Sequence, residues 1–170
     1  HYFSLGFRGI KVAAGSFTAG EGWYMPMDPK EAADFEADKL AFMRAHAGPD
    51  AWLMMDGHMG NNPQATWTLE VASAVATALE PYGLFFFEEP LHYTDPWGYA
   101  QLCKSTTVPI AGGECLTASY EWRVFAEQDC FDIGQPDASF TGGLGEFMAV
   151  AKMMQERGRK VATHAWGAGG

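Results

Sequence analysis

Short apolar segments alternate with helical patterns along this chain of 170 residues, and this repeat limits the possible folds more than any other feature. Six segments are short, rich in apolar residues and bounded by Gly, Pro or Asp, as expected of buried strands. These predicted strands are Phe7–Ala14, Ala51–Met55, Leu84–Phe87, Val108–Ala111, Cys130–Ile133 and Lys160–Thr163. Near-continuous apolar strands that alternate with helices are typical of a parallel sheet covered by helices, so the sequence predicts an α/β fold.

Helical segments fit between these strands. Asp28, Pro29 and Glu31 predict a helix start, as an N-cap, a proline at the first helical position and a reciprocal glutamate. This helix is expected to continue to about Ala47. The other predicted helices are residues 69–79 behind a Thr66 cap, one opened by Asp95-Pro96, one opened by Thr117, and residues 144–154.

Two architectures share this repeat, the open doubly wound sheet and the (β/α)₈ barrel. The nucleotide-binding form of the open sheet is disfavoured, because neither Gly-x-Gly-x-x-Gly nor Gly-x-x-x-x-Gly-Lys follows the first strand. A complete barrel usually needs about 250 residues. We therefore predict a TIM-type barrel of which residues 1–170 form a part, with about six β-α units, as a partial catalytic barrel domain.

Each predicted strand carries an ionisable residue in or just beyond its C-terminal half. These residues are Lys11, Asp56, Glu88 with Glu89, Glu114, Asp137 and His164. From Asp56 onward the intervals are 32, 26, 23 and 27 residues, about one β-α unit each. Because active-site groups of a barrel converge at the carboxyl ends of its strands, this series predicts an active site there.

Three acids in this series predict a metal site. Asp56, Glu88 and Glu114 come from successive strands and would repel one another in a barrel mouth without a cation between them. Ligation by carboxylate oxygens alone favours Mg²⁺, and the chain has no His-Glu-x-x-His helix or Cys/His cluster for zinc. Neighbouring strand residues point to opposite sides, so Glu88 is assigned inward and Glu89 to a structural hydrogen bond or ion pair.

Composition excludes several classes of partner. The net charge is −10 without a compensating basic cluster, which argues against binding nucleic acid or an anionic membrane. No window of the sequence approaches the roughly 18 apolar residues of a membrane span. The three cysteines form no Cys-x-x-Cys pair and cannot all be bridged, which predicts a reducing cytoplasmic location.

The ordered motifs at these strand ends resemble those of a known family. They are Gly6–Lys11, Met55-Asp56, Phe87-Glu88-Glu89-Pro90, Gly113-Glu114, Gln135-Pro136-Asp137 and Thr163-His164. The chain resembles the C-terminal barrel domain of the enolase superfamily, in its branch of mandelate racemase and muconate lactonizing enzyme. The resemblance implies a modified (β/α)₇β barrel, with an N-terminal capping domain and the last barrel strand outside this chain.

The resemblance also implies a chemistry. Reactions of this superfamily begin with removal of a proton next to a carboxylate, and a divalent metal stabilises the resulting enediolate. The implied metal ligands are Asp56, Glu88 and Glu114. Asp137 would orient His164, which makes His164 the candidate general base.

Two departures from the family pattern bear on the reaction. Members of the branch often carry Lys-x-Lys on the second strand, whereas this chain has Lys11-Val12-Ala13. Ala13 cannot take a proton, so a two-base racemase lacks one base, and Lys11 is expected to bind the substrate carboxylate or offset enediolate charge. Asp56-Gly57-His58 is similar to sugar-acid dehydratases, and His58 shares the inward parity of Asp56. His58 would act there as a general acid, or alternatively only contact substrate hydroxyls or the region of Glu88 and Glu89.

These expectations lead to a Mg²⁺-dependent acid-sugar dehydratase acting on a small-molecule carboxylate. The alternative is a racemase, epimerase or lactone cycloisomerase of the same superfamily, and a remoter alternative is a metal-binding barrel without catalysis. We expect the loop at residues 16–25 to line the substrate pocket with its aromatic side chains. We also expect the full-length protein to be a homo-oligomer.

Overall fold

Six parallel strands form one sheet in the computed structural model, which describes residues 3–62 and 66–165. Their order, β1-β4-β5-β6-β7-β8, follows the chain without a reversal. The strands are β1 (Gly9–Ala13), β4 (Trp52–Asp56), β5 (Phe86–Glu88), β6 (Ile110–Gly112), β7 (Ile133–Gly134) and β8 (Lys160–Val161). Since a doubly wound sheet reverses its order at a switch point, the sequential order belongs to a barrel and confirms the predicted fold class.

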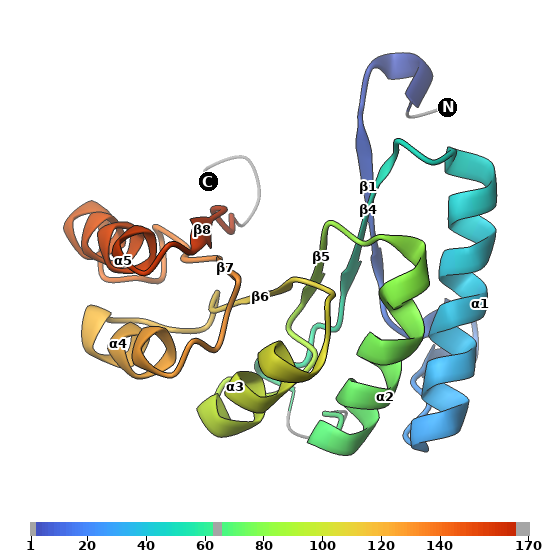
Figure 1. The fold of residues 1–170 in the computed structure, drawn as a ribbon, viewed down its shortest axis with the longest axis horizontal. Helices are drawn as coiled ribbons and strands as arrows, with labels where there is room; N and C mark the ends of the chain where they lie inside the picture. The colour runs from blue at the N-terminus through green and yellow to red at the C-terminus, as the bar shows by residue number, and fades with distance from the viewer. Residues whose placement is uncertain (1–2, 63–65, 166–170) are drawn as a thin grey trace.

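The helices lie on the outside of this curved sheet and follow one another around it from α1 to α5 (Figure 1). They are α1 (Pro29–Ala47), α2 (Leu69–Leu79), α3 (Pro96–Ser105), α4 (Ser119–Glu127) and α5 (Leu144–Glu156), with short 3₁₀ helices η1 (Phe3–Leu5) and η2 (Glu80–Tyr82). In the described part of the chain, no helix combines the length and apolar character that crossing a membrane requires. The five helices predicted from the sequence are all present.

The two faces of the sheet bury different residues, and this decides where the acids lie. Met55 and Phe87 pack in the main core between the sheet and the helices. Phe86 belongs to a second, smaller cluster together with Ala111 and Ile133, against which Met54 packs. Because side chains alternate along a strand, Asp56 continues the face of Met54 and Glu88 continues the face of Phe86. Both carboxylates therefore extend from the inner face, at the carboxyl ends of their strands.

The start of α1 follows the predicted cap. The Asp28 carboxylate accepts hydrogen bonds from the backbone N–H groups of Lys30 and Glu31, each at 3.0 Å, and Pro29 is the first helical residue. The Glu31 carboxylate instead accepts from the Tyr24 hydroxyl at 2.5 Å. Glu31 thus connects the helix to the segment before it.

Two other helix starts differ from the prediction. The N-cap of α2 is Thr68, whose hydroxyl accepts from Val71 N–H at 3.4 Å, so the predicted Thr66 cap is wrong. α4 begins at Ser119, two residues after Thr117. The Glu121 carboxylate accepts from the Thr117 N–H at 2.6 Å, which satisfies a backbone donor ahead of the first turn.

The segment predicted as a loop at residues 16–25 contains a short antiparallel hairpin. Its strands are β2 (Ser16–Thr18) and β3 (Gly22–Tyr24), and Gly20 and Gly22 adopt φ values of 90° and 92° at the turn. Those positive values suit glycine because it has no Cβ to clash. The exposed rings of Phe17 and Trp23 lie 6.3 Å apart on this hairpin.

Candidate active site

The register of the sheet brings ionisable side chains together at the carboxyl ends of the strands. Ala13 pairs with Asp56, and Asp56 pairs with Glu88, so these three residues lie side by side on β1, β4 and β5. A cavity of about 270 Å³ opens at this edge. Its lining residues are Lys11, Val12, Ala13, Asp56, His58, Glu114 and His164.

Lys11 bridges the two buried carboxylates of this edge. Its Nζ lies 2.7 Å from Asp56 Oδ2 and 2.5 Å from Glu88 Oε2. Burial alone would lower the pKa of Lys11, but hydrogen bonds and charge from Asp56 and Glu88 outweigh burial and raise it. Lys11 is therefore a cation at neutral pH, which suits binding of negative charge and not removal of a proton.

His58 reaches the cavity from the loop that follows β4. Its Nε2 lies 3.2 Å from Asp56 Oδ2, and its backbone N–H donates to Asp56 Oδ1 at 3.0 Å. β4 ends at Asp56, and His58 has a φ of 51°, in the left-handed region. His58 therefore reaches the cavity as predicted, but the alternation of side chains along a strand does not explain its position, because His58 lies beyond the strand. A turn in the backbone places the imidazole, and its side chain stays 65% exposed.

Asp137 and His164 form a tight pair across the ends of the last two units. An isolated parallel β-bridge joins the two residues, and His164 Nδ1 lies 2.7 Å from Asp137 Oδ2. The other oxygen of Asp137 accepts from Ser139 N–H at 2.7 Å and from Ser139 Oγ at 2.5 Å. Burial alone would raise the pKa of Asp137, but the hydrogen bonds from Ser139 and His164 outweigh it and lower that pKa. An ionised Asp137 thus orients the imidazole, and Nε2 faces the cavity.

Glu114 lies between this pair and the other acids. Its Oε2 is 3.1 Å from His164 Nε2. Burial raises the pKa of Glu114 most, the charge of His164 lowers it, and the carboxylates of Glu88 and Asp56 raise it. The three predicted metal ligands therefore act on one another electrostatically, as neighbours across one mouth of the sheet do.

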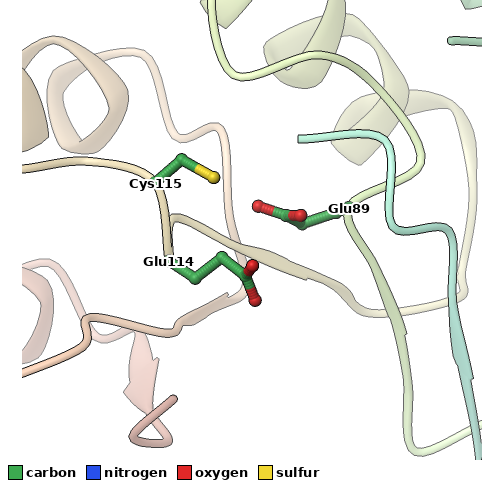
Figure 2. A group of neighbouring side chains, drawn as sticks. All are labelled: Glu89, Glu114 and Cys115. Carbon is green, nitrogen blue, oxygen red and sulfur yellow. The ribbon is translucent and has the colours of Figure 1, made fainter. Parts of the chain in front are cut away.

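Glu89, the second acid of the Glu-Glu-Pro motif, belongs to a different cluster. Ligand atoms of Glu89, Glu114 and Cys115 all lie within 4.8 Å of one another (Figure 2). This group shares only Glu114 with the predicted metal ligands. Glu89 Oε2 accepts from Gly60 N–H at 3.2 Å, which confirms the structural hydrogen bond expected of it.

Glu89 and Cys115, two ionisable groups of that cluster, have raised pKa values. Burial, together with the charges of Glu114, Asp56 and Glu88, raises the pKa of Glu89 to about 8, against the hydrogen bond from Gly60 N–H, which lowers it. Burial, Glu89 and Glu114 likewise raise the pKa of Cys115 to about 12. Cys115 is therefore a protonated thiol at neutral pH and faces the Glu89 carboxyl group as a donor.

Comparison with known families assigns this chain to one of them. The model of the enolase C-terminal domain-like family matches residues 2–170. The chain belongs to this family. Among curated relatives, arabinonate dehydratase from Saccharolobus solfataricus is 31% identical over 172 residues, which cover all of this chain and 40% of the relative.

Solved structures of the enolase superfamily show the same fold. The 3,6-anhydro-D-galactonate cycloisomerase from Zobellia galactanivorans superposes with a TM-score of 0.80 at 31% identity, over 98% of this chain and 41% of its own. L-Talarate dehydratase from Polaromonas sp. JS666, complexed with Mg and L-glucarate, superposes with a TM-score of 0.78 at 27% identity, over 96% of this chain and 41% of its own. This chain thus spans about two-fifths of the length of the relatives it matches.

The side chains of this site have the chemistry that a magnesium ion prefers, although among the described residues Asp56, Glu88 and Glu114 are not gathered as closely as Glu89, Glu114 and Cys115 are. Asp56, Glu88 and Glu114 offer carboxylate oxygens, the ligands that Mg²⁺ prefers. The ammonium group of Lys11 already stands between Asp56 and Glu88, in contact with an oxygen of each. A position where two buried carboxylates hold one cation is suited to a divalent ion, with Glu114 on the adjoining strand end.

Proposed function

We propose that this chain carries the reacting groups of an acid-sugar dehydratase, which removes the proton next to a carboxylate and then eliminates water. One observation carries the proposal: the same cavity is lined by two histidines that different carboxylates hold, His164 by Asp137 and His58 by Asp56. An elimination of water needs one group to remove the α-proton and another to protonate the leaving hydroxyl, and two separately held histidines can fill these two roles. Similarity to arabinonate dehydratase and to an L-talarate dehydratase that binds L-glucarate supports an acid sugar as substrate.

His164 has the role of base in this proposal. Asp137 holds the Nδ1 side of the ring, so Nε2 is the nitrogen that takes the α-proton. The ionised Asp137 favours the imidazolium that results, because an opposite charge stabilises it.

Lys11 stabilises the negative charge that proton removal creates. Its ammonium group lines the cavity, and its two carboxylate partners raise its pKa and so favour the protonated form. A Mg²⁺ ion held by Asp56, Glu88 and Glu114 would add a second positive charge beside the substrate carboxylate.

His58 completes the elimination by protonating the leaving group. The hydroxyl on the β-carbon departs with its bonding electrons and takes the proton of His58 to become water. The enol that remains gains a proton at the carbon that lost the hydroxyl and gives up its own O–H proton, which yields a 2-keto-3-deoxy acid. Relative to the substrate, the product has lost one molecule of water.

A cycloisomerase or racemase of the same superfamily is the alternative, favoured by the similarity to the galactonate cycloisomerase. Ala13 lines the cavity where a second lysine would be the base of a two-base racemase. That position favours dehydration over racemisation. The remoter alternative, a metal-binding barrel without catalysis, does not account for the clustered charges. The cytoplasmic location, the homo-oligomer and the domain limits remain predictions from the sequence.

Variants of the full-length parent protein test the proposal on a panel of acid sugars. His164→Asn should lower the rates of both α-proton exchange in D₂O and product formation by about 10²–10⁴-fold, because the general base is lost. His58→Asn should reduce water elimination while α-proton exchange continues. His92→Asn is the matched control, since His92 pairs with the Thr94 hydroxyl outside the cavity.

Product mass decides between the alternatives. A dehydratase yields a keto-deoxy acid lighter than its substrate by one water. Inversion of the α-carbon without that product would contradict the proposal. Equal effects of His58→Asn and His92→Asn on elimination would remove His58 from the mechanism.

A further inference from the structure

The buried carboxyl group of Glu89 has no part in the mechanism above. Glu89 follows the last residue of β5, is 3% exposed and has a φ of 41°. Such a backbone conformation is uncommon for a residue with a side chain. Its two sides contact two loops that bring reacting groups to the cavity.

On one side, Glu89 holds the loop that carries His58. Gly60 N–H donates to Glu89 Oε2 at 3.2 Å, and Met59 N–H donates to the Glu89 carbonyl at 3.3 Å. Gly57 N–H donates to the carbonyl of Glu88 at 2.7 Å. Residues 57, 59 and 60 therefore all bind the end of β5, and His58 lies between them.

The contact with Gly60 is close enough to exclude any side chain. A Cβ on Gly60 would lie 2.2 Å from Glu89 Oε1, well inside van der Waals contact. A Cβ on Gly57 would lie 2.4 Å from the Glu89 carbonyl oxygen. The loop backbone thus packs directly on Glu89, and its two glycines permit that approach.

On the other side, Glu89 meets the loop that follows β6. Its carboxyl group points toward Glu114 and Cys115 (Figure 2), and the ligand atoms of the three lie within 4.8 Å of one another. Glu114 in turn contacts His164. One carboxyl group therefore connects the His58 loop with the segment that carries Glu114.

These three residues are better suited to hold two loops together than to bind an ion. Glu89 Oε2 already faces a backbone N–H, whose positive end repels a cation. Cys115 offers a thiol, which the hard ion Mg²⁺ does not prefer. The cluster is therefore a set of hydrogen-bonding contacts between segments.

We propose that Glu89 is a positioning residue, which fixes the 57–60 loop against the 114–115 segment and so keeps His58 beside the cavity. The consequence for catalysis rests on the proposed function, in which His58 protonates the leaving hydroxyl. Without the Glu89 carboxyl group the Gly60 N–H loses its acceptor, and no side chain then joins the loop to the 114–115 segment in the described contacts. The remaining hydrogen bonds of the loop include those of Gly57 and Met59 to the backbone of β5, of His58 N–H to Asp56, and of Tyr93 N–H to the Gly60 carbonyl.

Hydrogen–deuterium exchange on the full-length parent protein tests the positioning without reference to activity. Glu89→Ala should speed amide exchange in residues 57–62 by about 10-fold or more, with a smaller increase in residues 113–117. Glu89→Gln keeps an oxygen acceptor for Gly60 N–H and should stay near wild type. Glu36→Ala is the matched control, because Glu36 is also buried and accepts from Gly15 N–H at 2.6 Å. It should speed exchange near residue 15 and not in 57–62.

The ratio of α-proton exchange to water elimination is the second readout. Glu89→Ala should raise this ratio several-fold in the direction of His58→Asn, whereas Glu36→Ala should leave it unchanged. If Glu89→Ala fails to fold, Gly60→Ala replaces it, since its Cβ displaces the loop from the carboxyl group.

Each result decides one point. Unchanged protection of residues 57–62 in Glu89→Ala overturns the proposal, whatever the activity. If His58→Asn raises the ratio and Glu89→Ala does not, the positioning of His58 is overturned as well. If His58→Asn itself leaves the ratio unchanged, the dehydratase role of His58 is wrong, and the exchange data alone decide on Glu89.

Discussion

A single ammonium group pairs with two buried acids at the mouth of the sheet. Asp56 and Glu88 are 4% and 1% exposed, and burying unpaired carboxylates costs several kcal/mol each. Lys11 is in contact with both. A divalent ion between the same acids would compensate their charge more fully than the lysine does. We therefore expect Lys11 and a bound Mg²⁺ to compensate the charge of this pair together.

Replacing Lys11 by Met should make the stability of the parent enzyme depend more on magnesium. Without metal, the variant should lose about 1–3 kcal/mol, a buried-pair cost reduced for solvent screening because the Lys11 side chain is 40% exposed. Thermal unfolding with and without Mg²⁺ measures the effect, and the rise in Tm on adding Mg²⁺ should exceed that of wild type.

Lys39→Met is the control for the Lys11 variant. Lys39 also pairs with a buried carboxylate, lying 2.6 Å from Glu36 Oε2, but it does not line the cavity. It should lose stability that magnesium does not restore. If Mg²⁺ raises the Tm of Lys11→Met by no more than that of wild type, Lys11 does not stand in for the metal.

At this scale the sequence predicts the acids better than their partners. Asp56, Glu88 and Glu114 follow from spacing, since parallel strands end at one edge. Their service as metal ligands remains a prediction. The contact of Ser139 with Asp137 was missed, although the Asp-x-Ser spacing favours such a bond. The position of His58 depends on a φ of 51°, which strand periodicity cannot predict.

Helices and strands were predicted where the sequence carries a clear cap or a long enough apolar pattern, and they were missed where it does not. α1 begins at Pro29 because Asp28 caps it, and this combination is visible in the sequence. Thr66 and Thr68 are equivalent by residue type, so the choice between them depends on how the chain packs before α2. The hairpin of β2 and β3 was missed because strands of three residues carry too little alternation to detect.

Arg44 connects the end of α1 with the segments that precede β4 and β5, at the amino ends of these strands and away from the cavity. Its Nη1 donates to the carbonyls of Gly48 and Ala51 at 3.0 and 2.7 Å, between the end of α1 and β4. Its Nε and Nη2 donate to the Tyr82 carbonyl at 3.0 and 2.8 Å, just before β5. The planar guanidinium thereby satisfies carbonyl groups at the end of α1 and in the turn after α2.

Arg44→Lys should destabilise the parent protein by about 1–3 kcal/mol, because a single ammonium cannot reach the same carbonyls in the same plane. Urea unfolding measures the loss. Arg123→Lys is the control at an exposed helical position and should stay within about 0.5 kcal/mol of wild type. A similar, small effect of both substitutions would show that the Arg44 contacts contribute little.

For the molecule as a whole, the described sheet has two open edges, one at β1 and one at β8. An edge strand presents unpaired N–H and C=O groups that template pairing with another chain. Aromatic side chains near the amino ends of the strands add an apolar surface, since Trp52 and Phe85 stack 5.2 Å apart and are 48% and 40% exposed. Closure of a barrel would remove the open edges, so the described sheet is expected to be less stable alone than within a closed barrel.

Expressed alone, residues 1–170 should therefore associate or aggregate, whereas the full-length parent should melt cooperatively. Open edges and exposed aromatic rings both favour contact between copies, and neither is relieved by the net charge of −10, which is spread over the whole chain. Size-exclusion chromatography with light scattering measures the mass, and thermal unfolding at several concentrations measures the cooperativity. Association should increase with protein concentration and decrease when the parent's remaining segments are supplied in trans, because those segments can pair with β1 and β8. A monomer that unfolds in one sharp transition, independent of concentration, would show that the six-stranded sheet is stable without closure.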